Sequence, residues 1–502
     1  MLQAAGKAWN RKNFEQGIEI LERASRLDPA NAGILLDLGR MYGLRYDYAA
    51  AERCFEKAVR IAPKKTEALV AAGQQSRDFG NYAMAERYYL RAVEQKDAGP
   101  VPFVQLAKLY ERRRRMKDAA DMVERALQLN NTCPEALLIR AQLARQSGRL
   151  DEAERLIGSF VHQPNSDIWI QAQTWYELGG ILDRQGKYDE AMAAFRQAKA
   201  RLRPNAGPHI AELKIVRGRL EKMKAGLSAE TLQRWFDAGQ LFQPPHQLAL
   251  LGGHPRSGTT LLEQVLDSHP DIVSAEETTI FHDEAYIPLA RSLPDNEPML
   301  SVLEAAPASA LQQSRTGYFR SVEGFLGQPI GERLLIDKNP SVTFLIPLLI
   351  RVFPEIKFLI ALRDPRDVVL SCFMQSFLPL TQGNSAYLSL ESTVEEYTAL
   401  MKMWKTIAPL IKNPCLEVRY EDMVNDLESV ARRTLDFLNV PWDARVLGFD
   451  EHARGKVVRS PTYADVTKPV YKGAVGRWRH YQKYLEPYLE KLDPFVKAFG
   501  YE

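Results

Sequence analysis

One short loop contains the residue types of an anion-binding site. Residues Pro255 to Thr260 read PRSGTT, which supplies an arginine, three hydroxyl side chains and a glycine. The apolar segment His246 to Gly252 precedes the loop, and the pattern of an amphipathic helix begins within it. Such a strand, loop and helix start can bind phosphate or sulfate, because N–H groups of the first helical turn point outward and the helix dipole adds positive charge. We therefore expect an anion at this loop.

The residue after the second loop glycine separates two kinds of chemistry. Gly253 and Gly258 have the spacing of the nucleotide-triphosphatase loop G-x-x-x-x-G-K-[ST], but Thr259 stands where that loop has lysine. An ATP-dependent kinase needs this lysine on the terminal phosphates and magnesium on the next hydroxyl. A sulfonate carries one negative charge, so hydroxyls, backbone amides and an arginine can bind it without a metal. Thr259 therefore favours a sulfonate site with no metal, and magnesium-dependent phosphate transfer would restore the kinase alternative.

The same loop resembles the phosphosulfate loop of the sulfotransferase superfamily, in particular that of the tyrosylprotein sulfotransferases. The resemblance implies that the donor is 3′-phosphoadenosine 5′-phosphosulfate (PAPS). The residues that it assigns to the 5′-phosphosulfate are Arg256, Ser257, Gly258, Thr259 and Thr260. Arg256 is also assigned to the catalytic residues. A chance PRSGTT on a structural turn is the alternative.

A second anion-binding pair is expected after the strand Ile356 to Leu362. Arg363 opens the sequence RDPRD at the end of this strand, and Ser371 lies two helical turns further on, so both side chains can converge on one phosphate. In the resembled family such a pair binds the 3′-phosphate of the donor. The alternative is a loop of surface ion pairs. Gln375 stands where a further basic contact is expected, which leaves the affinity for the 3′-phosphate open.

Two adjacent carboxylates could supply the base that sulfuryl transfer to a hydroxyl requires. Glu276 and Glu277 lie at the expected end of the strand after the loop helix. Their repulsion, together with the nearby anion, is expected to raise the pKa of at least one of them. The resemblance assigns the base to Glu277. An exposed acidic turn is the alternative, and His282 is the rival base, because small-molecule sulfotransferases use a histidine.

Further residues match the resembled family in three segments. Lys338 follows an apolar strand in the sequence DKNP and corresponds to the lysine that stabilises the leaving phosphate and the transferred sulfonate. A solvated strand-end lysine is the alternative. Tyr420, in VRYED, and Thr462 and Arg477, around the C-terminal KPVYKG and GRW, are candidate donor contacts. A structural role is the alternative for Tyr420.

The first two hundred residues repeat with a single period. A small residue is followed by a large apolar residue four positions later and by another small or apolar residue three positions after that. The first members of these triplets are spaced by 34 residues, at Gly17, Ala51, Ala85, Ala119 and Ala153. The series continues at Ala191 after an insertion of four residues. The pattern resembles the tetratricopeptide repeat (TPR), a 34-residue pair of antiparallel helices. Such repeats form a solenoid whose concave face usually binds peptides or proteins, which is the partner expected here.

Composition limits the remaining possibilities. The 502 residues are 45% hydrophobic and 26% charged, as in a globular chain rather than a disordered one. The formal net charge of +3 gives no broad attraction to nucleic acid or to an anionic membrane. The four cysteines show no CxxC spacing, so neither a disulfide framework nor a zinc site is indicated. Without a secretory signal or an uninterrupted apolar span, a cytoplasmic location is expected.

The predicted fold is an all-α TPR solenoid followed by an α/β, P-loop-like sulfotransferase domain with a central parallel sheet. The predicted boundaries are 1–205 for the solenoid, 206–244 for a capping helix and linker, and 245–502 for the sulfotransferase domain. The predicted function is sulfuryl transfer from PAPS to a hydroxyl acceptor, with protein tyrosine as the expected acceptor. The alternatives are a small-molecule or glycan acceptor, or a catalytically silent nucleotide-binding scaffold. The solenoid partner and the oligomeric state, a homodimer included, are left open.

Overall fold

The computed structural model describes residues 1–162, 167–239, 242, 246–290, 298–378, 380–456, 458–460 and 463–501. Its chain divides into two compact units. The first comprises Met1–Phe160 and Arg320–Gln328, and the second comprises Val161–Phe319 and Pro329–Glu502. Within the described ranges, no helix is long and apolar enough to cross a membrane. The domain boundaries given above stay a prediction, since they concern which segments fold independently.

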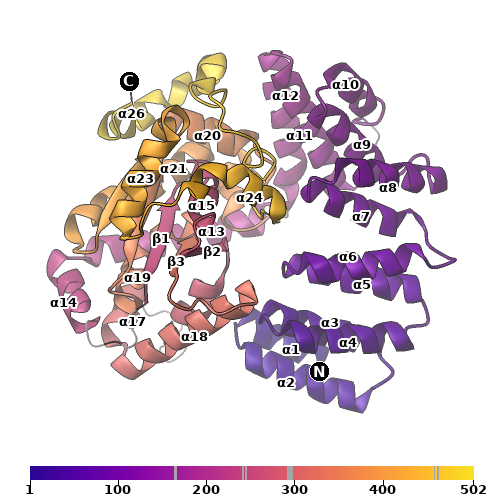
Figure 1. Cartoon of the computed structure of the whole chain (residues 1–502), viewed down its shortest axis with the longest axis horizontal. Helices are drawn as coiled ribbons and strands as arrows, with labels where there is room; N and C mark the ends of the chain where they lie inside the picture. The colour runs from indigo at the N-terminus through magenta and orange to yellow at the C-terminus, as the bar shows by residue number, and fades with distance from the viewer. Residues whose placement is uncertain are drawn as a thin grey trace. The chain divides into compact units, whose positions relative to one another are not determined.

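The first unit consists mainly of consecutive helix pairs, drawn in indigo and purple in Figure 1. In each pair the two helices contact one another along their length. The bounds of the ten helices are α1 Leu2–Asn10, α2 Phe14–Leu27, α3 Ala32–Leu44, α4 Tyr48–Ile61, α5 Lys65–Asp78, α6 Tyr82–Val93, α7 Pro100–Arg112, α8 Met116–Leu129, α9 Pro134–Gln146 and α10 Leu150–Gly158.

Glycines of the first helix in a pair lie against aromatic rings of the second. A Cβ on Gly39 would lie 2.4 Å from the ring of Phe55, and one on Gly73 would lie 2.4 Å from the ring of Tyr89. The separation along the chain is the same in both cases. No larger residue fits at these glycines unless the ring moves. The 34-residue period of the sequence is therefore a period of side-chain packing.

The second unit begins with helices as well. Helices α11 Ile168–Arg184 and α12 Tyr188–Leu202 repeat the same packing, because a Cβ on Gly179 would lie 2.7 Å from the ring of Phe195. Helices α13 Gly207–Gly226 and α14 Ala229–Gly239 follow. The α11–α12 pair thus has the repeat sequence pattern but belongs to the same compact unit as the sheet.

A five-stranded parallel sheet forms the centre of the second unit. Its strand order is β2-β3-β1-β4-β5. The bounds are β1 Leu248–Gly253, β2 Ile272–Glu276, β3 Leu334–Lys338, β4 Lys357–Leu362 and β5 Cys415–Arg419. All residues of β1 are buried, as expected for a strand of a parallel sheet that is covered on both faces. The parallel sheet that the sequence predicts is confirmed.

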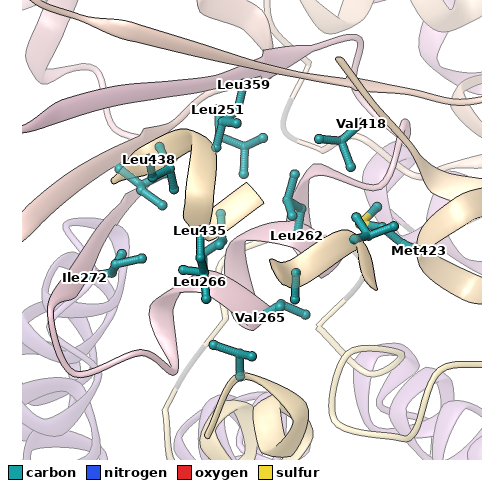
Figure 2. Packing of buried hydrophobic residues seen from close by; sticks show 14 of the residues in the cluster. Leu251, Leu262, Val265, Leu266, Ile272, Leu359, Val418, Met423, Leu435 and Leu438 are labelled. Carbon is teal, nitrogen blue, oxygen red and sulfur yellow. The ribbon is translucent and has the colours of Figure 1, made fainter. Parts of the chain in front are cut away.

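Helices after β1 cover the sheet and complete the core. Leu262 and Leu266 of the loop helix pack with Leu251 and Leu359 of the sheet and with Leu435 (Figure 2). The helix bounds are α15 Thr259–Asp267, α16 Ile287–Ala290, α17 Met299–Ala305, α18 Ala308–Leu326, α19 Ile346–Val352, α20 Pro365–Met374, α21 Leu390–Ile407, α22 Tyr420–Asn425, α23 Leu427–Leu438, α24 Phe449–Gly455, α25 Gln482–Leu485 and α26 Leu489–Ala498. This packing fixes α15 against the sheet, and with it the loop that precedes the helix.

The register of the strands brings their carboxyl ends to one edge of the sheet. Glu276 at the end of β2 pairs with Lys338 at the end of β3, and Lys338 also pairs with Leu251 in β1. On the other side of β1, Gly253 pairs with Ala361 in β4. Ligands of open parallel sheets bind at this edge, next to the strand where the order of connection reverses. Strand β1 is that strand here, because β2 and β3 lie on one side of it and β4 and β5 on the other.

Candidate active site

The loop after β1 has a backbone conformation that favours its glycines. Gly253 and Gly258 have φ angles of +122° and +93°. A Cβ on Gly253 would lie 2.4 Å from the carbonyl oxygen of Ala361, and one on Gly258 would lie 2.7 Å from the ring of Tyr420. Arg256 has a φ of +72° without being glycine, a strain that the surrounding fold must maintain. The loop therefore has an unusual backbone conformation at Arg256, its basic residue.

The first turn of α15 supplies hydrogen-bond donors at this loop. The earliest bond of the helical ladder runs from the N–H of Leu262 to the carbonyl of Gly258, at 3.1 Å. The N–H groups of Thr259 and Thr260 precede this bond and have no partner within the helix. The Thr260 hydroxyl donates to Ser460 Oγ at 2.8 Å. The turn thus has the backbone donors of an anion site, with one of its hydroxyls already bonded to Ser460.

Two of the predicted donor-binding residues, Ser371 and Arg363, each contact a third, Arg256. Arg256 Nε donates to Ser371 Oγ at 3.0 Å, and Arg363 Nη1 donates to the carbonyl of Arg256 at 3.3 Å. They come from the loop, from helix α20 and from the end of β4. The structure therefore brings together the arginine predicted for the phosphosulfate and the pair predicted for the 3′-phosphate.

Arg363 is buried at the carboxyl edge of the sheet, and only some of its N–H groups have hydrogen-bond partners among the described residues. Its side chain packs on the ring of Tyr420 at 4.9 Å, and Nη2 donates to the carbonyl of Ala474. Its Nε is buried without a hydrogen-bond partner in the described part of the chain. Such an unpaired group on a charged side chain costs free energy unless a ligand satisfies it. Tyr420 in turn crowds Gly258, so its ring supports both the arginine and the loop.

The surface ion-pair alternative for RDPRD describes only part of that segment. Asp364 caps α20 by accepting the N–H of Arg366, and the two side chains form an ion pair at 2.7 Å. Asp367 is buried and accepts the N–H groups of Gly476 and Trp478, both at 2.7 Å. The carboxylates of this segment therefore organise the helix and the C-terminal segment.

One buried lysine lies among three carboxylates on the other side of β1. Lys338 Nζ is 2.7 Å from Glu277, 3.4 Å from Glu276 and 3.5 Å from Glu263. Its side chain is 0% exposed, so the solvated-lysine alternative is wrong. Burial alone would lower the pKa of Lys338, but the three carboxylates outweigh it and raise that pKa. The lysine is thus held as a cation next to the loop helix.

The two adjacent glutamates have different environments. Glu276 is buried and accepts the backbone N–H groups of Arg459 and Ser460, both at 2.8 Å. Although burial raises its pKa, Lys338 and these N–H groups lower it overall, so repulsion does not raise the pKa of Glu276. Glu277 has a φ of +49°, and its side chain is 35% exposed. Of the two, Glu277 is the carboxylate that stays partly exposed.

Sequence reasoning missed the third carboxylate of this cluster. Glu263 lies on α15 and is fully buried, and it accepts the hydroxyl of Ser274 at 2.7 Å. Burial raises its pKa to about 7, although Lys338 lowers it. A charged residue within the apolar run LLEQVL was the available signal. Its partner lies in a strand that is remote in the sequence, so the pattern alone could not identify it.

The histidines near the loop have other partners. His282 lies in a π-helical turn, Phe281–Tyr286, where Nδ1 is 3.1 Å from Asp283. This contact does not connect His282, the alternative base, with Lys338 and its three carboxylates. His254 is fully buried, and burial lowers its pKa to about 4. Its carbonyl accepts the N–H of Ser257 at 3.1 Å, which places Ser257 in the tight turn of the loop.

The C-terminal candidates are described only in part. Thr462 lies outside the described residues. Arg477 forms an ion pair with Asp183 of α11. Gln375, at the place where a further basic residue was expected, bonds through its side chain to Ser376. A basic residue from another element, Lys199 of α12, reaches this position and donates to the carbonyl of Gln375 at 3.4 Å.

Family models match parts of both the repeat region and the region that contains the sheet. The model of the sulfotransferase family matches residues 249–444. Models of the tetratricopeptide repeat match residues 32–62, 104–158 and 172–201. These matches confirm the resemblances stated from the loop and from the 34-residue period.

Similar proteins share parts of the chain. An uncharacterized protein of Aquifex aeolicus is 25% identical over 354 residues, which cover 69% of this chain and 44% of that protein. Protein-tyrosine sulfotransferase 1 of Danio rerio is 29% identical over 238 residues, which cover 46% of this chain and 65% of that protein. The chain thus spans less than two thirds of these curated relatives. Among solved structures, the sulfotransferase domain of the Synechococcus PCC 7002 olefin synthase is similar, with a TM-score of 0.38 and 22% identity, covering 52% of this chain and 97% of that one.

Proposed function

We propose that this chain transfers the sulfuryl group of PAPS to a hydroxyl acceptor. Its sulfotransferase domain follows an N-terminal TPR region in the sequence. The observation that carries the proposal is the pairing of Lys338 with Glu277 at 2.7 Å, at the same sheet edge as the loop. A base and a cation side by side suit a reaction in which a hydroxyl loses a proton while charge develops on the transferred group.

The donor would bind through Arg256 to Thr260 and through Arg363 and Ser371. Two observations support this assignment. Arg363 Nε is buried and lacks a partner among the described residues, so a phosphate oxygen would satisfy it. The first turn of α15 offers N–H groups outside the helical ladder. We assign Tyr420 to the support of Arg363, and Thr462 and Arg477 stay candidate contacts.

In the reaction, Glu277 would accept the proton of the acceptor hydroxyl. The acceptor oxygen then forms a bond to sulfur, the bond from sulfur to the 5′-phosphate oxygen breaks, and the phosphate takes the electron pair. Protonation removes the charge of Glu277, so its attraction for Lys338 weakens. The ammonium can then stabilise the transferred sulfonate and the leaving phosphate. Arg256 would stabilise the same charge from the loop. This division of roles makes Glu277 the base and Lys338 the electrostatic catalyst.

Tyrosine in a peptide or protein is the acceptor that we propose. Relatives named protein-tyrosine sulfotransferases and the partly exposed Glu277 support it. The repeats are suited to hold a peptide or protein partner. Incubation of the full chain with labelled PAPS and acidic tyrosine peptides should label tyrosine. Labelling of sugars, lipids or small phenols alone would contradict this acceptor.

A titration with 3′,5′-adenosine bisphosphate (PAP), the product of the donor, tests the class of reaction separately. The chain should bind PAP equally with and without magnesium. Binding without turnover on any acceptor would favour a silent scaffold. Phosphate transfer that depends on magnesium would indicate a kinase instead.

A further inference from the structure

The last helix pair with the repeat pattern is attached to the C-terminal segment within the second unit. The carboxylate of Asp183, on α11, pairs with Arg477 and also accepts the hydroxyl of Tyr481 at 2.7 Å. Its side chain is 12% exposed, against 34% for Arg477. Both oxygens of this largely buried carboxylate therefore bind groups that follow residue 476.

A second contact between the same elements is different in character. Asp189, at the start of α12, pairs with Lys483 at 2.7 Å and accepts the hydroxyl of Tyr484 at 2.9 Å. These two charged side chains are 64% and 60% exposed, so water screens the pair and it contributes little. The α11–α12 pair thus offers one buried and one exposed carboxylate, each bound to an arginine or lysine and a tyrosine of the C-terminal segment.

The segment held by Asp183 also contacts the predicted donor site. The Ala474 carbonyl accepts Arg363 Nη2, and Arg363 Nη1 donates to the carbonyl of Arg256. Asp367 fixes the same segment from α20 by accepting the N–H groups of Gly476 and Trp478. Residues 474–478 are therefore held by α20 on one side and by α11 on the other. Through the Ala474 carbonyl, this segment supplies one of the contacts that orient Arg363.

We propose that Asp183 is a positioning residue for the donor site. By holding Arg477, it keeps residues 474–478 in place against Arg363, so the α11–α12 pair is a working part of the donor site although its sequence is that of a repeat. This inference rests on the proposed function, because it assumes that Arg363 binds the donor. Asp183 itself does not touch Arg363. The route that we propose runs through Arg477, because Arg477 is the partner of Asp183 that lies within residues 474–478.

The test compares Asp183→Asn with Asp189→Asn in the full chain. Asparagine is nearly isosteric and can still accept the tyrosine hydroxyl, so each change removes mainly the charge. We expect Asp183→Asn to weaken PAP binding by roughly tenfold in calorimetric titration, as for loss of coupling through a positioning residue. The KM for PAPS should rise in parallel, with kcat at saturating donor little changed. Asp189→Asn should change PAP affinity by less than about twofold.

A double-mutant cycle with Arg477→Met tests the route. In the Arg477→Met background, Asp183→Asn should weaken PAP binding no further, because the partner is already absent. Equal PAP affinities of the two asparagine variants would overturn the inference, and so would an undiminished effect of Asp183→Asn in the Arg477→Met background. A chain that binds no PAP before any substitution would instead contradict the proposed function, and the inference would fall with it.

Discussion

The repeat helices and the carboxyl edge of the sheet bury opposite kinds of side chain. In the repeats the buried positions hold small residues and rings, as where Phe55, 0% exposed, packs on Gly39. At the sheet edge the buried positions hold ionisable side chains, since Lys338 and Glu263 are also 0% exposed. Burial of a ring stabilises the fold, whereas burial of an ion costs free energy that its partners only partly return. The first region therefore contributes stability, whereas the second gives up stability for the buried ionisable groups that the proposed function requires.

The largest effect on stability is expected in the repeats. Phe55→Ala removes a ring that fills the space beside Gly39 and should lower the free energy of unfolding by about 3–5 kcal/mol. Urea denaturation, with hydrogen exchange of the α3 and α4 amides, measures it. Leu90→Ala, at a side chain that is 41% exposed on α6, is the control and should change little. If the folded Phe55→Ala variant bound the donor more weakly, the repeats would affect donor binding as well as stability, which would contradict the proposed difference between the two regions.

The largest effect on chemistry is expected at the sheet edge. Glu277→Gln keeps the shape of the side chain but cannot accept a proton, so turnover should fall roughly a hundredfold or more while PAP binding persists. Steady-state rates and PAP titration measure the two properties. Glu332→Gln, at an exposed glutamate before β3, is the control. Unchanged turnover would move the base to His282.

A smaller effect is expected on donor binding. Arg363→Ala removes a charged phosphate partner and should weaken PAP binding by roughly tenfold to a hundredfold. Arg432→Ala removes an arginine that is 48% exposed on α23, and this variant should bind PAP normally. Normal binding by Arg363→Ala as well would place the donor elsewhere.

The smallest effect concerns pH and the buried charge itself. Burial raises the pKa of Glu263 to about 7, above its value of about 4.5 in an unfolded chain. Between these values the folded chain holds a proton that the unfolded chain releases, so this group makes the protein less stable as pH rises from 5 to 7. Glu263→Gln removes that loss. Urea denaturation gives the free energy of unfolding of the variant and of the unaltered chain at each pH. The difference between the two should increase in favour of Glu263→Gln by about 1–3 kcal/mol from pH 5 to pH 7.

Glu332→Gln, at an exposed glutamate outside the Lys338 cluster, is measured alongside as the control for a glutamate-to-glutamine change. A difference for Glu263→Gln that does not change with pH would show that its carboxyl is not held protonated in the fold.

Much of the candidate site could be predicted because its residues follow local rules. The glycines at 253 and 258 are needed for left-handed backbone and close packing, and residues at strand ends meet at one edge of a parallel sheet. Other parts could not be predicted. Glu263 looks like a surface position of an amphipathic helix until β3 places Lys338 beside it. Likewise, Asp183 is an ordinary repeat residue until the chain returns with Arg477.

The sequence by itself determined the glycine-containing loop after β1, the repeat period and the parallel sheet, because each depends on residues that are close together or regularly spaced. Only the tertiary structure decided which of two adjacent glutamates is partly exposed beside the lysine and which is buried against backbone N–H groups. It also decided that a repeat helix holds the C-terminal segment. The physical reason is that these contacts join residues from separate strands and helices, and their distances are set by strand register and helix packing rather than by spacing along the chain.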